Sequence, residues 1–69
     1  MSLRKMQVGK KYIVGDGYGY DKVECLAINL DQFPGCYTVK IKYDDTGTED
    51  YFFESDDYHG LYVEEVNES

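Results

Sequence analysis

The stretch from Tyr37 to Glu54 constrains the fold of this chain more than any other part of the sequence. Within Tyr37–Tyr43, aromatic and β-branched residues alternate with threonine and lysine, which is the period of a strand buried on one face. The next residues, Asp44–Gly47, are a polar run that ends in glycine, as in the tight turn of a hairpin. A second strand is predicted over Thr48–Glu54. The sequence therefore predicts an antiparallel β-hairpin.

Three further strands are predicted around this hairpin, over Lys10–Val14, Lys22–Leu30 and Leu61–Val66. The middle one is apolar at both parities from Cys25 to Ile28, and such a break in alternation is expected where a strand bends. No segment has a convincing helical period, so the sequence predicts an all-β fold of five strands. The predicted core consists of apolar strand residues: Tyr12, Val14, Val23, Cys25, Ile28, Val39, Ile41, Tyr51, Phe53 and Val63.

The length of the chain, 69 residues, suits one small domain. We expect a flexible N-terminus over residues 1–6, the domain over residues 7–66 and a frayed tail over residues 67–69. No run approaches the ~20 apolar residues of a membrane span, and the first residues lack the apolar run of a secretory signal. The two cysteines, Cys25 and Cys36, are expected to be free thiols, which favours a cytoplasmic protein.

The net charge of −7 is unevenly distributed along the chain. Residues 1–22 contain five basic and two acidic residues, whereas residues 23–69 contain two basic and twelve acidic residues. An acidic surface repels the phosphates of nucleic acid, which bind where lysine and arginine release counterions. It attracts basic proteins and speeds encounter with them. The composition therefore favours a basic protein partner and disfavours nucleic acid.

Three segments together follow the order of elements in a known small β-barrel. They are the VGKKYIV start, the YTVKIKYDDTGTEDYFF hairpin and the SDDYHGLYVEEV ending. With the long Gly/Tyr/Asp-rich first connection, they resemble an SH3-like barrel of the Tudor/KOW kind over about residues 7–66. The resemblance implies a single five-stranded barrel with a short 3-10 turn before the last strand, in residues 55–60. It concerns the fold, since this fold hosts many unrelated functions.

The stretch Val14–Val23 is a candidate recognition loop. It lacks the lysine and hydroxyl residue of a phosphate-binding loop and the helix that such a loop would open, and Asp16 and Asp21 would repel phosphate. Tyr18 and Tyr20 present flat, amphipathic side chains at a low cost in conformational entropy. We expect them to share one face with the Asp44–Gly47 turn. The alternative is a plain connection in which glycines permit chain reversals.

Seven acidic residues lie between Asp44 and Asp57. We expect them, together with the tyrosines, to form a docking surface for a basic or charged protein. The alternatives are a solvated face that guards edge strands and a calcium site, although the DDTGTED order does not match a calcium loop. The predicted partner-binding residues are aromatic or acidic: Tyr18, Tyr20, Tyr43, Asp44, Asp45, Phe52, Asp56 and Asp57.

The resemblance to Tudor-like domains implies a second possible function, an aromatic cage for a methylated or cationic group held by cation–π attraction. The members of this cage would be aromatic residues near acids: Tyr18 or Tyr20, Tyr43, and Tyr51 or Phe52, with Asp44 and Asp45. The chain has no tryptophan, which departs from the usual cage, and Tyr43 and Tyr51 also suit the core. A third possibility is nucleic-acid binding through Lys10 and Lys11, as in KOW-type barrels.

No catalytic or metal motif is present in the sequence. His59 is the single histidine, Cys25 lies in an apolar strand as an inert core thiol would, and the cysteines lack the spacing of a zinc site. We therefore expect a protein that is not an enzyme, with no cofactor and no metal, and that is a monomer or a weak homo-oligomer. In size and charge it resembles the small inhibitor or regulator proteins that phages and mobile elements encode.

Overall fold

The computed structural model describes residues 1–15, 17–55 and 61–67. In this part of the chain one short 3-10 helix precedes five strands. Their bounds are η1 (Leu3–Lys5), β1 (Lys11–Gly15), β2 (Tyr20–Leu30), β3 (Tyr37–Tyr43), β4 (Glu49–Glu54) and β5 (Tyr62–Glu65). The bounds of β3 are those predicted, and the other strands differ from prediction by at most about two residues at either end. No helix in the described residues is long and apolar enough to cross a membrane.

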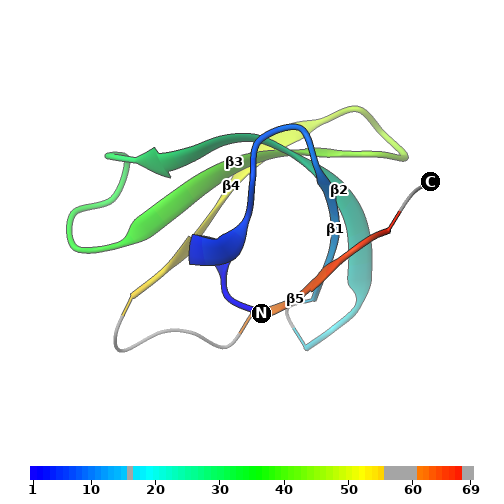
Figure 1. The fold of residues 1–69 in the computed structure, drawn as a ribbon, viewed down its shortest axis with the longest axis horizontal. Coiled ribbons are helices and arrows are strands. Elements are labelled where there is room, and N and C mark those ends of the chain that lie inside the picture. The colour runs from blue at the N-terminus through cyan, green and yellow to red at the C-terminus, as the bar shows by residue number, and fades with distance from the viewer. Residues whose placement is uncertain (16, 56–60, 68–69) are drawn as a thin grey trace.

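The strands form one antiparallel sheet in the order β4-β3-β2-β1-β5, which confirms the predicted all-β class. The sheet curls around η1 (Figure 1). Among the described residues β4 pairs only with β3, and β5 pairs only with β1. The sheet is therefore not closed into a barrel, and β4 and β5 are its two edges.

The bend in β2 arises from irregular pairing with β3. Register shifts separate Cys25 from Ala27 and Ala27 from Leu30, and Asn29 has a positive φ of 53°. Extra residues on one strand of a pair bend that strand and increase its twist. Figure 1 shows the resulting curve of β2 from one side of the sheet to the other. The predicted bend is thus confirmed, and it lets one long strand contribute to both halves of the curled sheet.

The core lies on the concave side of the sheet, and seven of the ten predicted core residues are buried in it. These are Tyr12, Val14, Val23, Cys25, Val39, Ile41 and Val63. Leu3 and Met6, which the prediction left out of the core, complete it at 0% and 2% exposure. They belong to the segment for which we expected a flexible N-terminus, and η1 contacts β3 and β4. A three-residue helix has no periodicity by which the sequence could have revealed it.

Ile28, Tyr51 and Phe53 were predicted in the core, and this was wrong, since they are 38%, 36% and 39% exposed. Ile28 lies within the second register shift of β2, between Ala27 and Leu30, where the alternation of the two faces is broken. In β4 the side chains of Phe52 and Glu54 point inward. The alternating residues Tyr51 and Phe53 point outward, because successive residues of a strand point to opposite faces. The prediction was thus off by one residue in the alternation, and such an error exchanges the two faces of a strand.

Glu54 is a charged residue on the inward side of β4. It is only 4% exposed, and its Oε1 accepts a hydrogen bond of 3.3 Å from the backbone N–H of Arg4. A buried carboxylate needs such a donor to offset the water it loses. The N-terminal segment supplies that donor, so the inward side of β4 depends on residues about fifty positions earlier in the chain.

Candidate functional site

A hollow of about 370 Å³ lies where β2 and the turn between β3 and β4 both begin. We call it the acidic hollow. Its lining residues are Tyr20, Asp21, Lys22, Asp44 and Asp45. The structure therefore brings a tyrosine of the first connection together with two acids of the hairpin turn, as the expected shared face requires. Tyr18, the other predicted tyrosine, is 98% exposed and is not among the lining residues.

Backbone hydrogen bonds place the turn beside β2. The N–H of Asp44 donates to the carbonyl of Lys22 at 3.0 Å. Across the turn, the N–H of Gly47 donates to the carbonyl of Tyr43 at 2.8 Å. Gly47 has a φ of +73°, a conformation that glycine adopts at little cost. The acids of the turn are thus held next to the start of β2 by the backbone itself.

Tyr20 is held over Gly15 on the neighbouring strand. Gly15 pairs with Tyr20 on one side and with Tyr62 on the other. A Cβ on Gly15 would lie 2.6 Å from Cδ1 of Tyr20, so the ring occupies the space that a side chain would need. The rings of Tyr20 and Tyr62 meet edge to face, with centroids 5.5 Å apart. Although Tyr20 is 71% exposed, its ring has fixed neighbours.

Tyr62 was not among the predicted site residues, because only the pairing of β1 with β5 brings it beside Tyr20. Its hydroxyl donates a hydrogen bond to Oε2 of Glu64. That bond, which favours the protonated phenol, raises the pKa of Tyr62 above its usual value. The sequence signal for this pair was weak: a glycine near the end of one strand and a tyrosine in another.

The carboxylates of the acidic hollow differ in whether a nearby lysine neutralises their negative charge. Oδ2 of Asp44 lies 2.9 Å from Nζ of Lys11 and 3.9 Å from Nζ of Lys22. Asp21 and Asp45 have no ion pair with any residue in the described part of the chain. The net negative charge of the hollow therefore resides on Asp21 and Asp45. Asp21 was missed as a site residue, although it follows Tyr20 directly.

A smaller hollow of about 50 Å³ shares Asp21 with the acidic hollow. We call it the aromatic hollow; its lining residues are Val14, Gly15, Asp21, Tyr43, Phe52 and Leu61. The ring centroids of Tyr43 and Phe52 are 6.3 Å apart, and the angle between the ring planes is 76°. Two of the predicted cage residues thus meet beside a carboxylate. Tyr51 lies on the other face of β4, where Nζ of Lys40 is 5.9 Å from its ring centroid.

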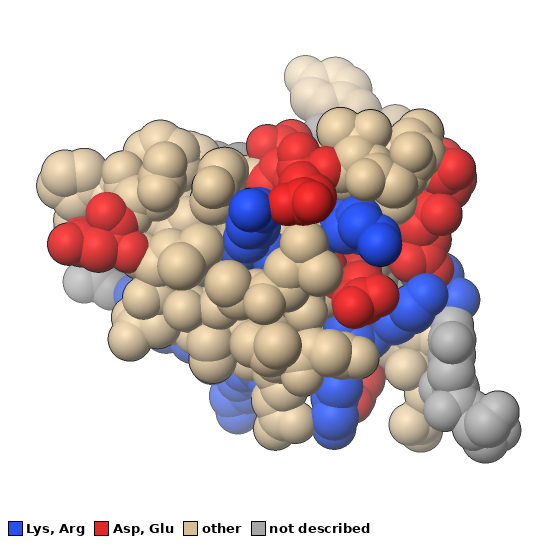
Figure 2. Space-filling model, turned by 90° about the horizontal axis from the view of Figure 1, so that it is seen from above, with Lys and Arg blue, Asp and Glu red and all other residues tan. Residues whose placement is uncertain are grey.

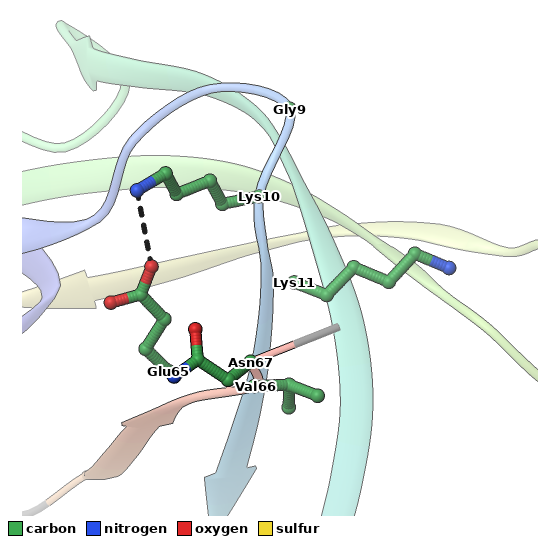
Figure 3. Close-up of a pocket in the computed structure, with 6 residues that line it drawn as sticks. All are labelled: Gly9, Lys10, Lys11, Glu65, Val66 and Asn67. Carbon is green, nitrogen blue, oxygen red and sulfur yellow. Dashed lines mark ion pairs between the residues drawn. The ribbon is translucent and has the colours of Figure 1, made fainter. Parts of the chain in front are cut away.

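The two lysines of the predicted basic front are both paired with acids. Lys10 lines a third hollow, of about 300 Å³, together with residues near the end of the chain. In it Nζ of Lys10 is 3.2 Å from Oε1 of Glu65, while Lys11 extends away from that pair (Figure 3) and reaches Asp44. Figure 2 likewise shows basic side chains between acidic ones on one face. Folding therefore removes much of the charge separation that the sequence displays.

The remaining candidates either lie outside the described residues or are cysteines. Asp56, Asp57 and His59 lie outside the described residues, as does most of the predicted 3-10 turn. Cys25 and Cys36 are both free thiols. Burial raises the pKa of Cys25, which keeps it a thiol and a poor nucleophile. Within residues 1–15, 17–55 and 61–67, no three His, Cys, Asp or Glu side chains cluster in a way that could hold a metal ion.

Comparison with models of known protein families found no match, and comparison with curated proteins and with solved structures found none either.

Proposed function

We propose that this protein is a non-enzymatic interaction module that binds basic side chains of a protein partner in the acidic hollow. The observation that carries the proposal is the meeting of Tyr20 and Asp21 with Asp45 around one hollow. Two of these residues are carboxylates without an ion-pair partner in the described chain. The third is an aromatic ring, whose face attracts cations.

The character of the hollow supports a protein partner. Tyrosine is enriched at interfaces because it combines a large apolar ring with a polar hydroxyl. The excess of acids over the whole chain would speed encounter with a basic surface. In this proposal Lys11 and Lys22 orient Asp44 and leave Asp21 and Asp45 to pair with the partner.

The test is calorimetric titration of the full chain with an acetylated hexa-arginine amide. Asp45→Asn should weaken binding about fivefold, because one uncompensated charge contact of about 1 kcal/mol is lost. Asp31→Asn is the matched control, since it removes one exposed acid in the connection between β2 and β3. Affinity should also fall steeply with salt. Equal losses in the two variants would contradict the proposal.

The aromatic hollow supports a second candidate, the cage for a methylated or cationic group. Tyr43, Phe52 and Asp21 supply two rings and a carboxylate around it, which is the chemistry that holds a quaternary ammonium. A peptide with trimethyllysine should then bind more tightly than the same peptide with lysine, and Tyr43→Ala should abolish the difference. Tyr51→Ala, on the other face of β4, is the control. Equal affinity for the two peptides would exclude the cage.

The strand order, the bend of β2 and the curl of the sheet support a relationship to SH3-like domains of the Tudor/KOW kind, although β4 and β5 do not pair to close a barrel within the described residues. The two free thiols support a cytoplasmic location, since disulfides are rare there. A small acidic module of this kind suits an inhibitor or regulator that occupies the basic surface of another protein. Nucleic-acid binding is the less favoured alternative, because Lys10 and Lys11 are paired with acids.

A further inference from the structure

The outer edge of β4 is the second surface of interest, and no residue of β4 lines the acidic hollow. β4 is the last strand of the sheet and pairs only with β3 among the described residues. Its register with β3 is unbroken from Tyr37↔Glu54 to Lys42↔Glu49. Edge strands are usually guarded by charged side chains, especially lysine, by proline, by a bulge or by short length, and the only charged residues of β4 are the acids Glu49, Asp50 and Glu54. β4 has six residues, no bulge, no lysine and no proline, whereas β5 at the other edge has four residues.

One backbone N–H at this edge is bonded to a side chain in place of a neighbouring strand. The N–H of Tyr51 donates to Oδ1 of Asp50 at 2.8 Å. A carboxylate oxygen thus takes the place of the carbonyl that a further strand would offer. That side chain is exposed, and it has no ion pair with any residue that the structure describes. A basic group could draw it away and leave the amide to a peptide carbonyl.

Exposed aromatic side chains lie beside the edge. Tyr51 and Phe53 are on the outer face of β4, and the ring of Phe33 packs against that of Phe53 at 5.0 Å between centroids. Thr38, which pairs with Phe53 across the strands, is fully buried. A strand added beside β4 would bring its alternate side chains against Tyr51 and Phe53.

The charge of β4 determines what kind of strand fits. A fully overlapping antiparallel pair of two β4 strands would set Glu49 opposite Glu54, and like charges directly opposite are destabilising. A second copy of this chain is therefore a poor occupant. A basic strand would instead meet Asp50, which has no counter-charge among the described residues. We propose that the edge of β4 binds an extended basic segment of a partner protein, which adds a sixth strand to the sheet.

The probe is the hexapeptide acetyl-Lys-Val-Lys-Val-Lys-Val-amide, titrated into the ¹⁵N-labelled full chain. Amide shifts should be largest within Glu49–Glu54. The same peptide with its internal amides N-methylated keeps the charge and side chains and loses the backbone donors. It should bind at least about tenfold more weakly, because two or more hydrogen bonds are lost. Equal affinity for the two peptides would overturn the proposal, as would the absence of binding.

Protein variants give the second arm of the test. Asp50→Lys should weaken binding of the unmethylated peptide about tenfold by reversing the charge at the edge. Glu64→Lys, which makes the same charge change on β5 at the opposite edge, should change it less than about twofold. Shifts confined to Tyr20, Asp21 and Asp45 would mean that the acidic hollow binds the peptide and the edge does not. Sedimentation of the protein alone should give a monomer; a dimer abolished by Asp50→Lys would make a second copy the occupant and overturn the proposal.

Discussion

The acidic hollow and the edge of β4 are both surfaces of acids and aromatics, yet they are built in different ways. The hollow depends on short-range geometry: a turn hydrogen-bonded to β2 and a glycine that leaves room for Tyr20. The edge depends on which side chains of β4 face inward, and the N-terminal segment contributes to that choice through Glu54. A surface formed by turns is determined by local sequence. A surface formed by one face of a strand depends on which side chains turn inward, and distant contacts determine that.

The largest effect should come from removing the N-terminal contribution to the core. Leu3→Ala deletes a side chain that is 0% exposed, and such a change costs about 2–5 kcal/mol of unfolding free energy. Urea denaturation measures it, and hydrogen exchange should show that β4 loses protection before the turn at Asp44–Gly47 does. Val8→Ala is the control, because Val8 is exposed and should change stability by less than about 0.5 kcal/mol. Similar effects of both changes would mean that the N-terminal segment does not support β4.

The parity of β4 can be tested within the strand itself. Glu54→Ala removes a buried carboxylate and leaves the N–H of Arg4 without the acceptor of a partly buried hydrogen bond, which should cost about 1–3 kcal/mol. Glu49→Ala removes an exposed acid that pairs with Lys40 at 2.9 Å, and surface ion pairs contribute at most about 1 kcal/mol. Thermal or urea denaturation compares the two variants. The reverse order of destabilisation would show that the opposite face of β4 is turned inward.

A smaller effect should follow from filling the space below Tyr20. In Gly15→Ala the new methyl group would lie 2.6 Å from Cδ1 of that ring, so the ring must move away from Tyr62. We expect a loss of about 1 kcal/mol in stability and the loss of ring-to-ring nuclear Overhauser contacts between the two tyrosines. Gly19→Ala is matched, because a Cβ there meets nothing within 4 Å. Intact contacts in Gly15→Ala would show that the hollow does not depend on this glycine.

The smallest effect concerns Tyr62 and alkaline pH. Its pKa is raised above the ordinary value of 10.0, first by the hydrogen bond to Glu64. The protonated phenol is thus favoured in the folded protein, so its contribution to stability is present below pH 10 and is lost as pH rises through the raised pKa. In ultraviolet titration Glu64→Gln should return one phenol to the ordinary range. Tyr62→Phe should remove a late-titrating phenol; removal of an early one would contradict the assignment.

The sequence predicted what local chemistry determines. The alternation in Tyr37–Tyr43 and the turn that follows specified β3 and the hairpin, and the loss of alternation between Cys25 and Ile28 marked the bend of β2. The meeting of Tyr20 with Asp44 and Asp45 followed from the order of the strands. In each case the deciding residues are neighbours in the chain or lie in adjacent strands.

The orientation of β4 and the contributions of Leu3, Met6 and Tyr62 depended on contacts that sequence patterns do not display. Tyr51, Phe52 and Phe53 are aromatic at both parities, so alternation could not decide which of them faces inward. The deciding partner of Glu54 is a backbone N–H at Arg4. Leu3, Met6 and Tyr62 were missed for the same reason, since their neighbours come from distant segments. Closure of the sheet into a barrel depends on the ends of β4 and β5, which no local pattern reveals.

The most direct test of the central claim is a nuclear magnetic resonance titration of the ¹⁵N-labelled chain with the acetylated hexa-arginine amide at low salt. If basic side chains bind in the acidic hollow, the largest amide shifts should fall at Tyr20–Lys22 and at Asp44 and Asp45, and they should shrink as salt screens the charges. Shifts of equal size at acids away from the hollow, such as Asp31 and Glu64, would contradict the claim. They would show that the peptide samples the whole acidic surface without a preferred site.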